Sequence, residues 1–191
     1  MDFEAVYLAR HGQTEWDVAG RRQGRLDSPL TAHGLLQAER NVGLLREQQI
    51  DGVFSSPIGR ARRTAEILAT GLPVTELDDL AEVSHGEWSG LTSAEIDAGW
   101  PGLRAARSAD KYGFRFPGGE SYADADVRAG RALAEVARAG VRRPLLVSHE
   151  MIGRMLLKQL GVAGVLQLRQ PSDVVYRVCA DGDVDRLTTA G

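Results

Sequence analysis

The chain is poor in cysteine and in long apolar runs. Cys179 is the single cysteine, so no disulfide can form within the chain, and we expect it to be a small buried residue on a strand. No apolar run approaches the roughly 18 residues that a membrane-spanning helix needs. The first residues, MDFEAVYLARHG, lack a basic segment followed by an apolar one, so we expect no signal peptide. These absences predict a cytoplasmic protein in a reducing compartment, without membrane contacts.

Neither sign of charge dominates the sequence. The 23 lysines and arginines face 26 aspartates and glutamates, which gives a net charge of −3 and no electrostatic reason to expect nucleic-acid binding. Lysine is scarce, since only Lys111 and Lys158 are present. The cations are therefore almost all arginines, which bind phosphate through a planar fork. Composition leaves open whether this reflects a coding bias or a phosphate site.

Short apolar strands alternate with amphipathic helices. We expect strands at 3–9, 51–57, 73–77, 143–149, 174–180 and 183–189. We expect helices at 31–49, 58–70, 92–99, 121–139 and 151–160. The last two strands flank Asp181-Gly182, a hairpin signal. The pattern predicts that residues 1–191 form one α/β domain in three layers, with a mostly parallel sheet, helices on both faces and an edge hairpin. Residues 78–120 are irregular and are expected to be an insertion that covers a site.

Three of these strands end in polar clusters. The clusters are Arg10-His11-Gly12, Ser55-Ser56-Pro57 with Arg60, Arg62 and Arg63 just beyond, and Ser148-His149-Glu150. The carboxyl ends of parallel strands meet at one edge of a sheet, where ligands bind. If these strands are neighbours, two histidines and at least two arginines converge there. Arginines beside a histidine favour a bound anion such as phosphate, and neutral imidazole is a competent nucleophile. Expelling an ester oxygen needs a proton donor, and Glu82 is our candidate.

These clusters stand inside longer blocks that resemble the histidine phosphatase superfamily, in the branch that also contains cofactor-dependent phosphoglycerate mutase. The resemblance covers nearly the whole chain, and its blocks occur in the order of the family. They are LARHGQTEWDVAGRRQG (8–24), RLDSPLTAHGLLQAE (25–39), SSPIGRARRTAEI (55–67), LAEVSHGEWSG (80–90), PGGES (117–121) and LLVSHEMIGRML (145–156).

The resemblance implies a role for each matching residue. His11 would attack the phosphorus and become phosphohistidine, with Arg10 and Arg60 binding the phosphoryl oxygens. His149 would hydrogen-bond the phosphoryl group and stabilise its charge. Glu82 would protonate the leaving alkoxide and then activate water. The implied substrate-binding residues are Arg10, Asp17, Gln23, Gly24, Arg60 and His149. No metal and no organic cofactor is implied.

Three positions depart from the family pattern. Asp17 stands where Asn is usual, Ser89 where Glu is frequent, and Glu150 where Gly is frequent. An ionised Asp17 can only accept a hydrogen bond, so it would repel a phosphate that it faced. Asp17 either pairs with Arg10, Arg21 or Arg22, or meets a hydroxyl or ammonium group of the substrate. We expect the first.

The leading functional hypothesis is a phosphomonoester hydrolase that acts on a small phosphorylated metabolite through phosphohistidine. A mutase is the first alternative, although mutases of this family are longer and show Glu-Arg-His-Tyr-Gly where this chain has Glu82-Val83-Ser84-His85-Gly86. A non-catalytic phosphate-binding module is the second. A metallohydrolase using His11, His85, His149 and Asp51 is the third, and the flanking arginines argue against it. The sequence names neither the substrate ester nor the oligomeric state.

Overall fold

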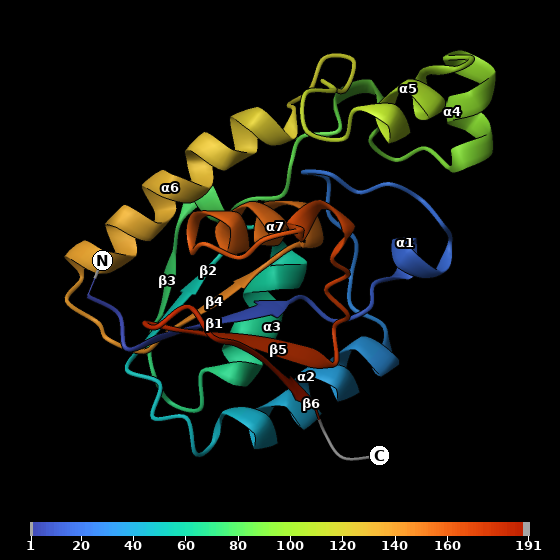
Figure 1. The fold of residues 1–191 in the computed structure, drawn as a ribbon. Coiled ribbons are helices and arrows are strands. Elements are labelled where there is room, and N and C mark those ends of the chain that lie inside the picture. Colours follow the sequence, from blue (N-terminus) through green and yellow to red (C-terminus); the bar gives the residue numbers. More distant parts are fainter. Residues whose placement is uncertain (1, 189–191) are drawn as a thin grey trace.

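A six-stranded sheet runs through the middle of the protein, in the order β3-β2-β4-β1-β5-β6 (Figure 1). The computed structural model describes residues 2–188. The strands are β1 (Ala5–Arg10), β2 (Gly52–Ser55), β3 (Val74–Glu76), β4 (Pro144–Ser148), β5 (Val174–Cys179) and β6 (Val184–Thr188). The first four strands are parallel, while β5 and β6 run antiparallel as an edge hairpin. This confirms the predicted mostly parallel sheet and its hairpin.

Helices cover both faces of the sheet. They are α1 (Glu15–Val18), α2 (Ala32–Leu45), α3 (Gly59–Leu68), α4 (Ser93–Gly99), α5 (Leu103–Ala109), α6 (Tyr122–Arg138) and α7 (Glu150–Gln159), with short 3₁₀ turns at Asp78–Leu80, Gly86–Trp88 and Val165–Gln167. Helices α6 and α7 pack on one face and α2 and α3 on the other. The protein is therefore the three-layer α/β domain that the sequence predicts.

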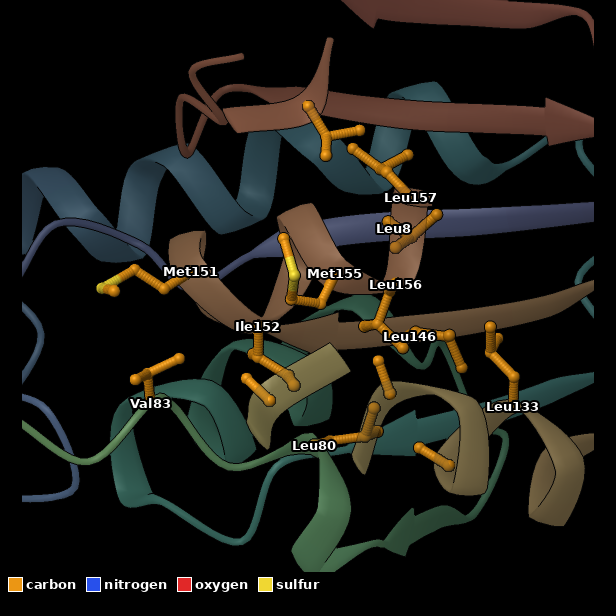
Figure 2. Close-up of a cluster of buried hydrophobic side chains, with 14 of the residues drawn as sticks. Leu8, Leu80, Val83, Leu133, Leu146, Met151, Ile152, Met155, Leu156 and Leu157 are labelled. Atoms are coloured by element: carbon orange, nitrogen blue, oxygen red, sulfur yellow. The ribbon is translucent and has the colours of Figure 1, made fainter. Parts of the chain in front are cut away.

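Strand β1 shows how the sequence builds these layers. Successive side chains of a strand point to opposite faces. Val6 and Leu8 accordingly join the core under α6 and α7, whereas Tyr7 and Ala9 join the core over α2 and α3. Figure 2 shows Leu8 and Leu146 of the sheet beside Leu133 of α6 and Ile152 and Leu156 of α7. All five residues of β4 are buried, as expected for a central strand covered on both faces.

The structure shortens several predicted elements and adds two helices. The helix predicted at 31–49 ends at Leu45, and the strand predicted at 51–57 is reduced to Gly52–Ser55. Thr189, at the end of the predicted last strand, lies outside the described residues. Helix α1 was not predicted because its four residues are too short to show a helical period, and a capping box between Thr14 and Asp17 starts it. Helix α5 was missed for the same reason of length.

Residues 78–120 contain α4 and α5, which lie beyond the main helices near the α1 loop (Figure 1). The aromatic residues of this segment extend the core under α6 and α7, since Trp88 is fully buried and its ring centroid lies 5.3 Å from that of Phe116. Trp100 is partly buried against the same cluster. Trp88 and Trp100 therefore serve packing. Cys179 lies on β5 as expected, although it is half-buried rather than buried. Within residues 2–188, no helix combines the length and apolarity required to cross a bilayer.

Candidate active site

The three polar clusters meet at one edge of the sheet. Strand β4 lies between β1 and β2, with Arg10 opposite Ser148 and Ser55 opposite Val147 in the register. The residues that follow each strand are thus neighbours in space. The ring centroids of His11 and His149 lie 5.1 Å apart, and the Nε of Arg60 lies 3.2 Å from Nε2 of His11. The predicted convergence of two histidines with arginines is confirmed.

The hydrogen bonds of His11 define its tautomer. Its Nδ1 lies 2.8 Å from the carbonyl oxygen of Gly12, which can only accept, so Nδ1 carries the hydrogen. Nε2 therefore holds the lone pair and accepts from Arg60. Burial, followed by the charges of Arg10 and Arg60, lowers the pKa of His11 well below its usual value. His11 is therefore a neutral imidazole with an available nucleophilic nitrogen at neutral pH.

Arg60 is buried at the start of α3 and is held by backbone oxygens. Its terminal nitrogens donate to the carbonyls of Leu26 and Gly24, at 2.6 and 2.8 Å, and to the carboxylate of Asp27 at 3.2 Å. Gly24 can approach this closely because its φ is +54°, and a Cβ there would lie 2.9 Å from the backbone nitrogen of His85. The guanidinium is thus fixed beside His11 before any ligand arrives.

Arg10 lies between two carboxylates. Its terminal nitrogens contact Asp17 at 3.4 Å and Glu150 at 3.3 Å, and its Nε is buried without a partner among the described residues. Asp17 also accepts from the backbone and hydroxyl of Thr14, both at 2.9 Å, and from the amide of Gln23 at 3.3 Å. The expectation that Asp17 pairs with an arginine is confirmed for Arg10. Both acidic departures from the family pattern therefore bind the same guanidinium.

His149 lies between the end of β4 and the start of α7 and is completely buried beside His11. Its Nε2 lies 2.8 Å from the hydroxyl of Ser56, which already accepts the backbone N–H of Ile58. The Ser56 hydroxyl has one hydrogen to donate, and we assign it to the lone pair of Nε2, which puts the ring hydrogen of His149 on Nδ1. Burial, together with the charge of Arg60, lowers the pKa of His149 well below its usual value. Its Nδ1 is buried and has no partner within residues 2–188, so it is a donor available to a ligand.

Glu82 follows the 3₁₀ turn at Asp78–Leu80, and its carboxylate contacts the first turn of α7. One carboxylate oxygen accepts the N–H groups of Val83 and Ile152 at 2.9 and 3.0 Å, and the other accepts that of Met151 at 3.1 Å. The bonds from Met151 and Ile152 satisfy N–H groups that the first turn of a helix leaves free. Glu82 is buried but lines the same pocket as His11. The structure thus gives this carboxylate a structural role in addition to the predicted chemical one.

A pocket of about 460 Å³ opens over these residues. Of the predicted site residues it is lined by Arg10, His11, Asp17, Gln23, Gly24, Arg60 and Glu82, while His149 lies behind them. The sequence missed other lining residues, which are Trp16, Arg21, Arg22, Ser93, Arg107, Lys111, Met151 and Arg154. His85 also lines the pocket, where burial and nearby arginines lower its pKa to about 3. No pattern in the sequence places these residues together, because they come from distant segments.

Of the residues of the metallohydrolase alternative, His11 and His149 lie side by side, but Asp51 is not near them. Asp51 lies at the opposite end of β2, where its carboxylate accepts the backbone N–H groups of Arg142 and Arg143, both at 2.8 Å. In the part of the chain that the structure describes, no three His, Cys, Asp or Glu side chains gather as a metal-binding group. That alternative is therefore wrong in its proposed ligand set.

Comparisons with known proteins agree with this geometry. The sequence model of the histidine phosphatase superfamily (branch 1) matches residues 6–179. A probable phosphoglycerate mutase of Proteus mirabilis is 36% identical over 168 residues, which cover 86% of this chain and 78% of that protein. The bifunctional 6-phosphofructo-2-kinase/fructose-2,6-bisphosphatase of Caenorhabditis elegans is 35% identical over 80% of this chain and 33% of its own length.

A solved structure matches along almost the full length of both chains. Mycobacterial glucosyl-3-phosphoglycerate phosphatase, in complex with VO3, superimposes with a TM-score of 0.85 at 30% identity. The match covers 98% of this chain and 100% of that one.

Proposed function

The chain belongs to the histidine phosphatase superfamily, and we propose that within it the protein is a phosphomonoester hydrolase that acts on a small phosphorylated metabolite through phosphohistidine. One observation carries the proposal. The neutral His11, with its lone pair on Nε2, lies beside the two guanidinium groups of Arg10 and Arg60 in the wall of an open pocket. A nucleophile placed among anion-binding groups is the arrangement that phosphoryl transfer requires.

In the first step, Nε2 of His11 attacks phosphorus as the bond to the ester oxygen breaks. Arg10 and Arg60 stabilise the charge on the phosphoryl oxygens, and Nδ1–H of His149 donates to the same group. The carboxylic acid of Glu82 gives its proton to the departing alkoxide. In the second step, the Glu82 carboxylate takes a proton from water, which attacks phosphorus and breaks the bond to Nε2. Inorganic phosphate leaves, and both side chains return to their starting states.

A mutase is the second candidate, because several relatives carry the name of phosphoglycerate mutase. It would use the same first step but return the phosphoryl group to another oxygen of the substrate. The hydrolase is favoured by the named phosphatase that matches the full length of this fold. The stretch from Glu82 to Gly86 also differs from the Glu-Arg-His-Tyr-Gly that mutases of this family usually show.

A panel of phosphomonoesters tests the proposal through release of inorganic phosphate. Rapid quench with labelled substrate should trap an acid-labile, base-stable phosphoenzyme, and His11→Ala should abolish it. Vanadate should inhibit, and a chelator should leave the rate unchanged. Isomerised ester without free phosphate would establish the mutase instead. Binding of phosphate esters without any turnover would establish a non-catalytic module.

A further inference from the structure

The pocket holds more positive charge than a single phosphate needs. Beyond Arg10 and Arg60 its lining includes five cationic side chains, which are Arg21, Arg22, Arg107, Lys111 and Arg154. Three of these have oxygen partners. Arg21 donates to the carbonyl of Gly90, Lys111 to that of Leu166, and Arg154 to that of Leu168. Arg22 and Arg107 are different, since neither guanidinium has an oxygen acceptor among residues 2–188.

Arg22 is held by its backbone rather than by its side chain. Its N–H donates to Leu91 at 3.0 Å, and its carbonyl accepts from Gly90 at 2.7 Å. Its Nε is buried without a partner in the described chain. The nearby carboxylate of Asp97 is already paired with Arg104 at 2.5 Å. Burial, followed by the charge of Arg107, lowers the pKa of Arg22. A half-buried cation in repulsion with a second cation is stabilised by any anion that fits between them.

Arg107 comes from α5 and lines the same pocket. Its guanidinium lies 5.3 Å from the centre of the Phe116 ring, and its single hydrogen-bond contact is a long one of 4.0 Å to the sulfur of Met151. Stacking on an aromatic ring orients a guanidinium but leaves its N–H groups free. The N–H groups of Arg107 are thus available for a ligand in the pocket.

The carboxylates of the pocket wall do not neutralise this pair. Asp17 and Glu150 contact Arg10, and Glu82 accepts three backbone N–H groups. His85, which also lines the pocket, is neutral because burial and the charges of Arg22 and Arg107 lower its pKa to about 3. Two unsatisfied guanidinium groups therefore face a water-accessible cavity that also contains the proposed nucleophile.

We propose that Arg22 and Arg107 bind a second oxyanionic group of the substrate, a carboxylate or a second phosphate, while Arg10 and Arg60 hold the phosphoryl group that is transferred. This inference rests on the proposed function and narrows its substrate class from phosphomonoesters in general to those with a second negative charge. A planar guanidinium matches both carboxylate and phosphate through two parallel N–H bonds.

Matched substrates of increasing chain length test the inference. Each set contains an ω-carboxyalkyl phosphate, the ω-hydroxyalkyl phosphate of equal length and the corresponding alkanediol bisphosphate. We expect kcat/KM for the best dianionic member to exceed that of its hydroxyl counterpart by about 10- to 100-fold, the range that hydrogen bonds to charged groups provide. Comparing carboxylate with bisphosphate members identifies which anion the pair prefers.

Variants then assign the preference to the two residues. Arg22→Met and Arg107→Met should each lower the ratio of the two kcat/KM values at least about tenfold, whereas Arg22→Lys should retain part of it. The ratio is independent of the fraction of folded enzyme. Arg115→Met is the control, since Arg115 lies in the same 78–120 segment but is exposed and paired with Asp124. Hydrolysis without any preference for the second anion, or a ratio that both variants leave unchanged, would overturn the inference. Absence of hydrolysis of every ester, nitrophenyl phosphate included, would overturn the proposed function instead.

Discussion

Replacing Glu82 by Gln separates two roles of one side chain. The carboxylate accepts N–H groups from Val83, Ile152 and Met151, so an amide in its place presents one acceptor oxygen and one donor nitrogen. At least one buried N–H then loses its acceptor, which costs about 1–3 kcal/mol. For a domain of this size each kcal/mol lowers the melting temperature by roughly 2–4 °C. Thermal unfolding should therefore detect the structural role by itself.

The chemical role has a different signature. A proton donor matters when the departing oxygen is a poor leaving group, so kcat/KM for an alkyl phosphate should fall by about 10²- to 10⁴-fold. Nitrophenolate leaves without protonation, so kcat/KM for nitrophenyl phosphate should fall much less. The second step still needs the Glu82 carboxylate as a base. The variant should therefore accumulate phosphoenzyme and release nitrophenolate in a burst that matches the enzyme concentration.

The control is Glu87→Gln, because Glu87 is exposed and does not line the pocket. If Glu82 acted only by supporting the start of α7, its variant would lose activity equally on both esters and show no burst. That result would refute our assignment of acid and base to Glu82.

Three further predictions follow from the same contacts. Asp17→Asn should change kcat/KM by no more than a few-fold, because the Asp17 side chain is 27% exposed where it contacts Arg10 and such ion pairs contribute about 0–1 kcal/mol. A loss of about 100-fold in steady-state assays would instead show that the carboxylate itself is catalytic. Ser56→Ala should lower kcat by about tenfold or more by leaving Nε2 of His149 without its partner, whereas Ser56→Thr, which keeps the hydroxyl, should retain most activity. Burial lowers the pKa of His11 and His149, so below about pH 6.5 the unfolded chain binds protons that the folded chain does not. The free energy of unfolding should therefore decrease as the pH falls below this value, by up to roughly 1.4 kcal/mol per pH unit for each group. Denaturant titrations that give equal free energies of unfolding at pH 7 and pH 5 would contradict this.

The centre of the site was predictable because it depends on strand ends. Arg10, His11 and His149 follow apolar runs that are readable as strands, and the topology of a parallel sheet brings such ends together. The same reasoning placed Arg60, Arg62 and Arg63 just beyond β2, and the family resemblance singled out Arg60. The strand-end positions need only local sequence and one general rule about sheets.

The walls of the pocket follow no such rule. Arg22 lies in a loop and Arg107 on a seven-residue helix, and both line the pocket because of how the 78–120 segment packs, with His85 and Arg107 in contact with Met151 of α7. That fold is built from an aromatic cluster around Trp88 and Phe116 and from backbone bonds between Arg22 and Gly90. Contacts between irregular segments leave no periodic trace in the sequence, so neither residue could be placed by pattern.

The charge of the pocket differs from the charge of the whole chain. The whole chain carries a net charge of −3, yet the pocket is lined by seven cationic side chains and three carboxylates. Two of those carboxylates, Asp17 and Glu150, contact Arg10, and neither forms an ion pair with Arg22 or Arg107 among the described residues. A site of this kind attracts small anions by its local field, which decays within about a Debye length, roughly 8 Å at physiological salt. A polyanion such as nucleic acid also meets the acidic remainder of the surface, whereas a small phosphate ester inside the pocket does not. The mild acidity of the chain therefore argues against polyanions while leaving a strongly basic pocket for a compact one.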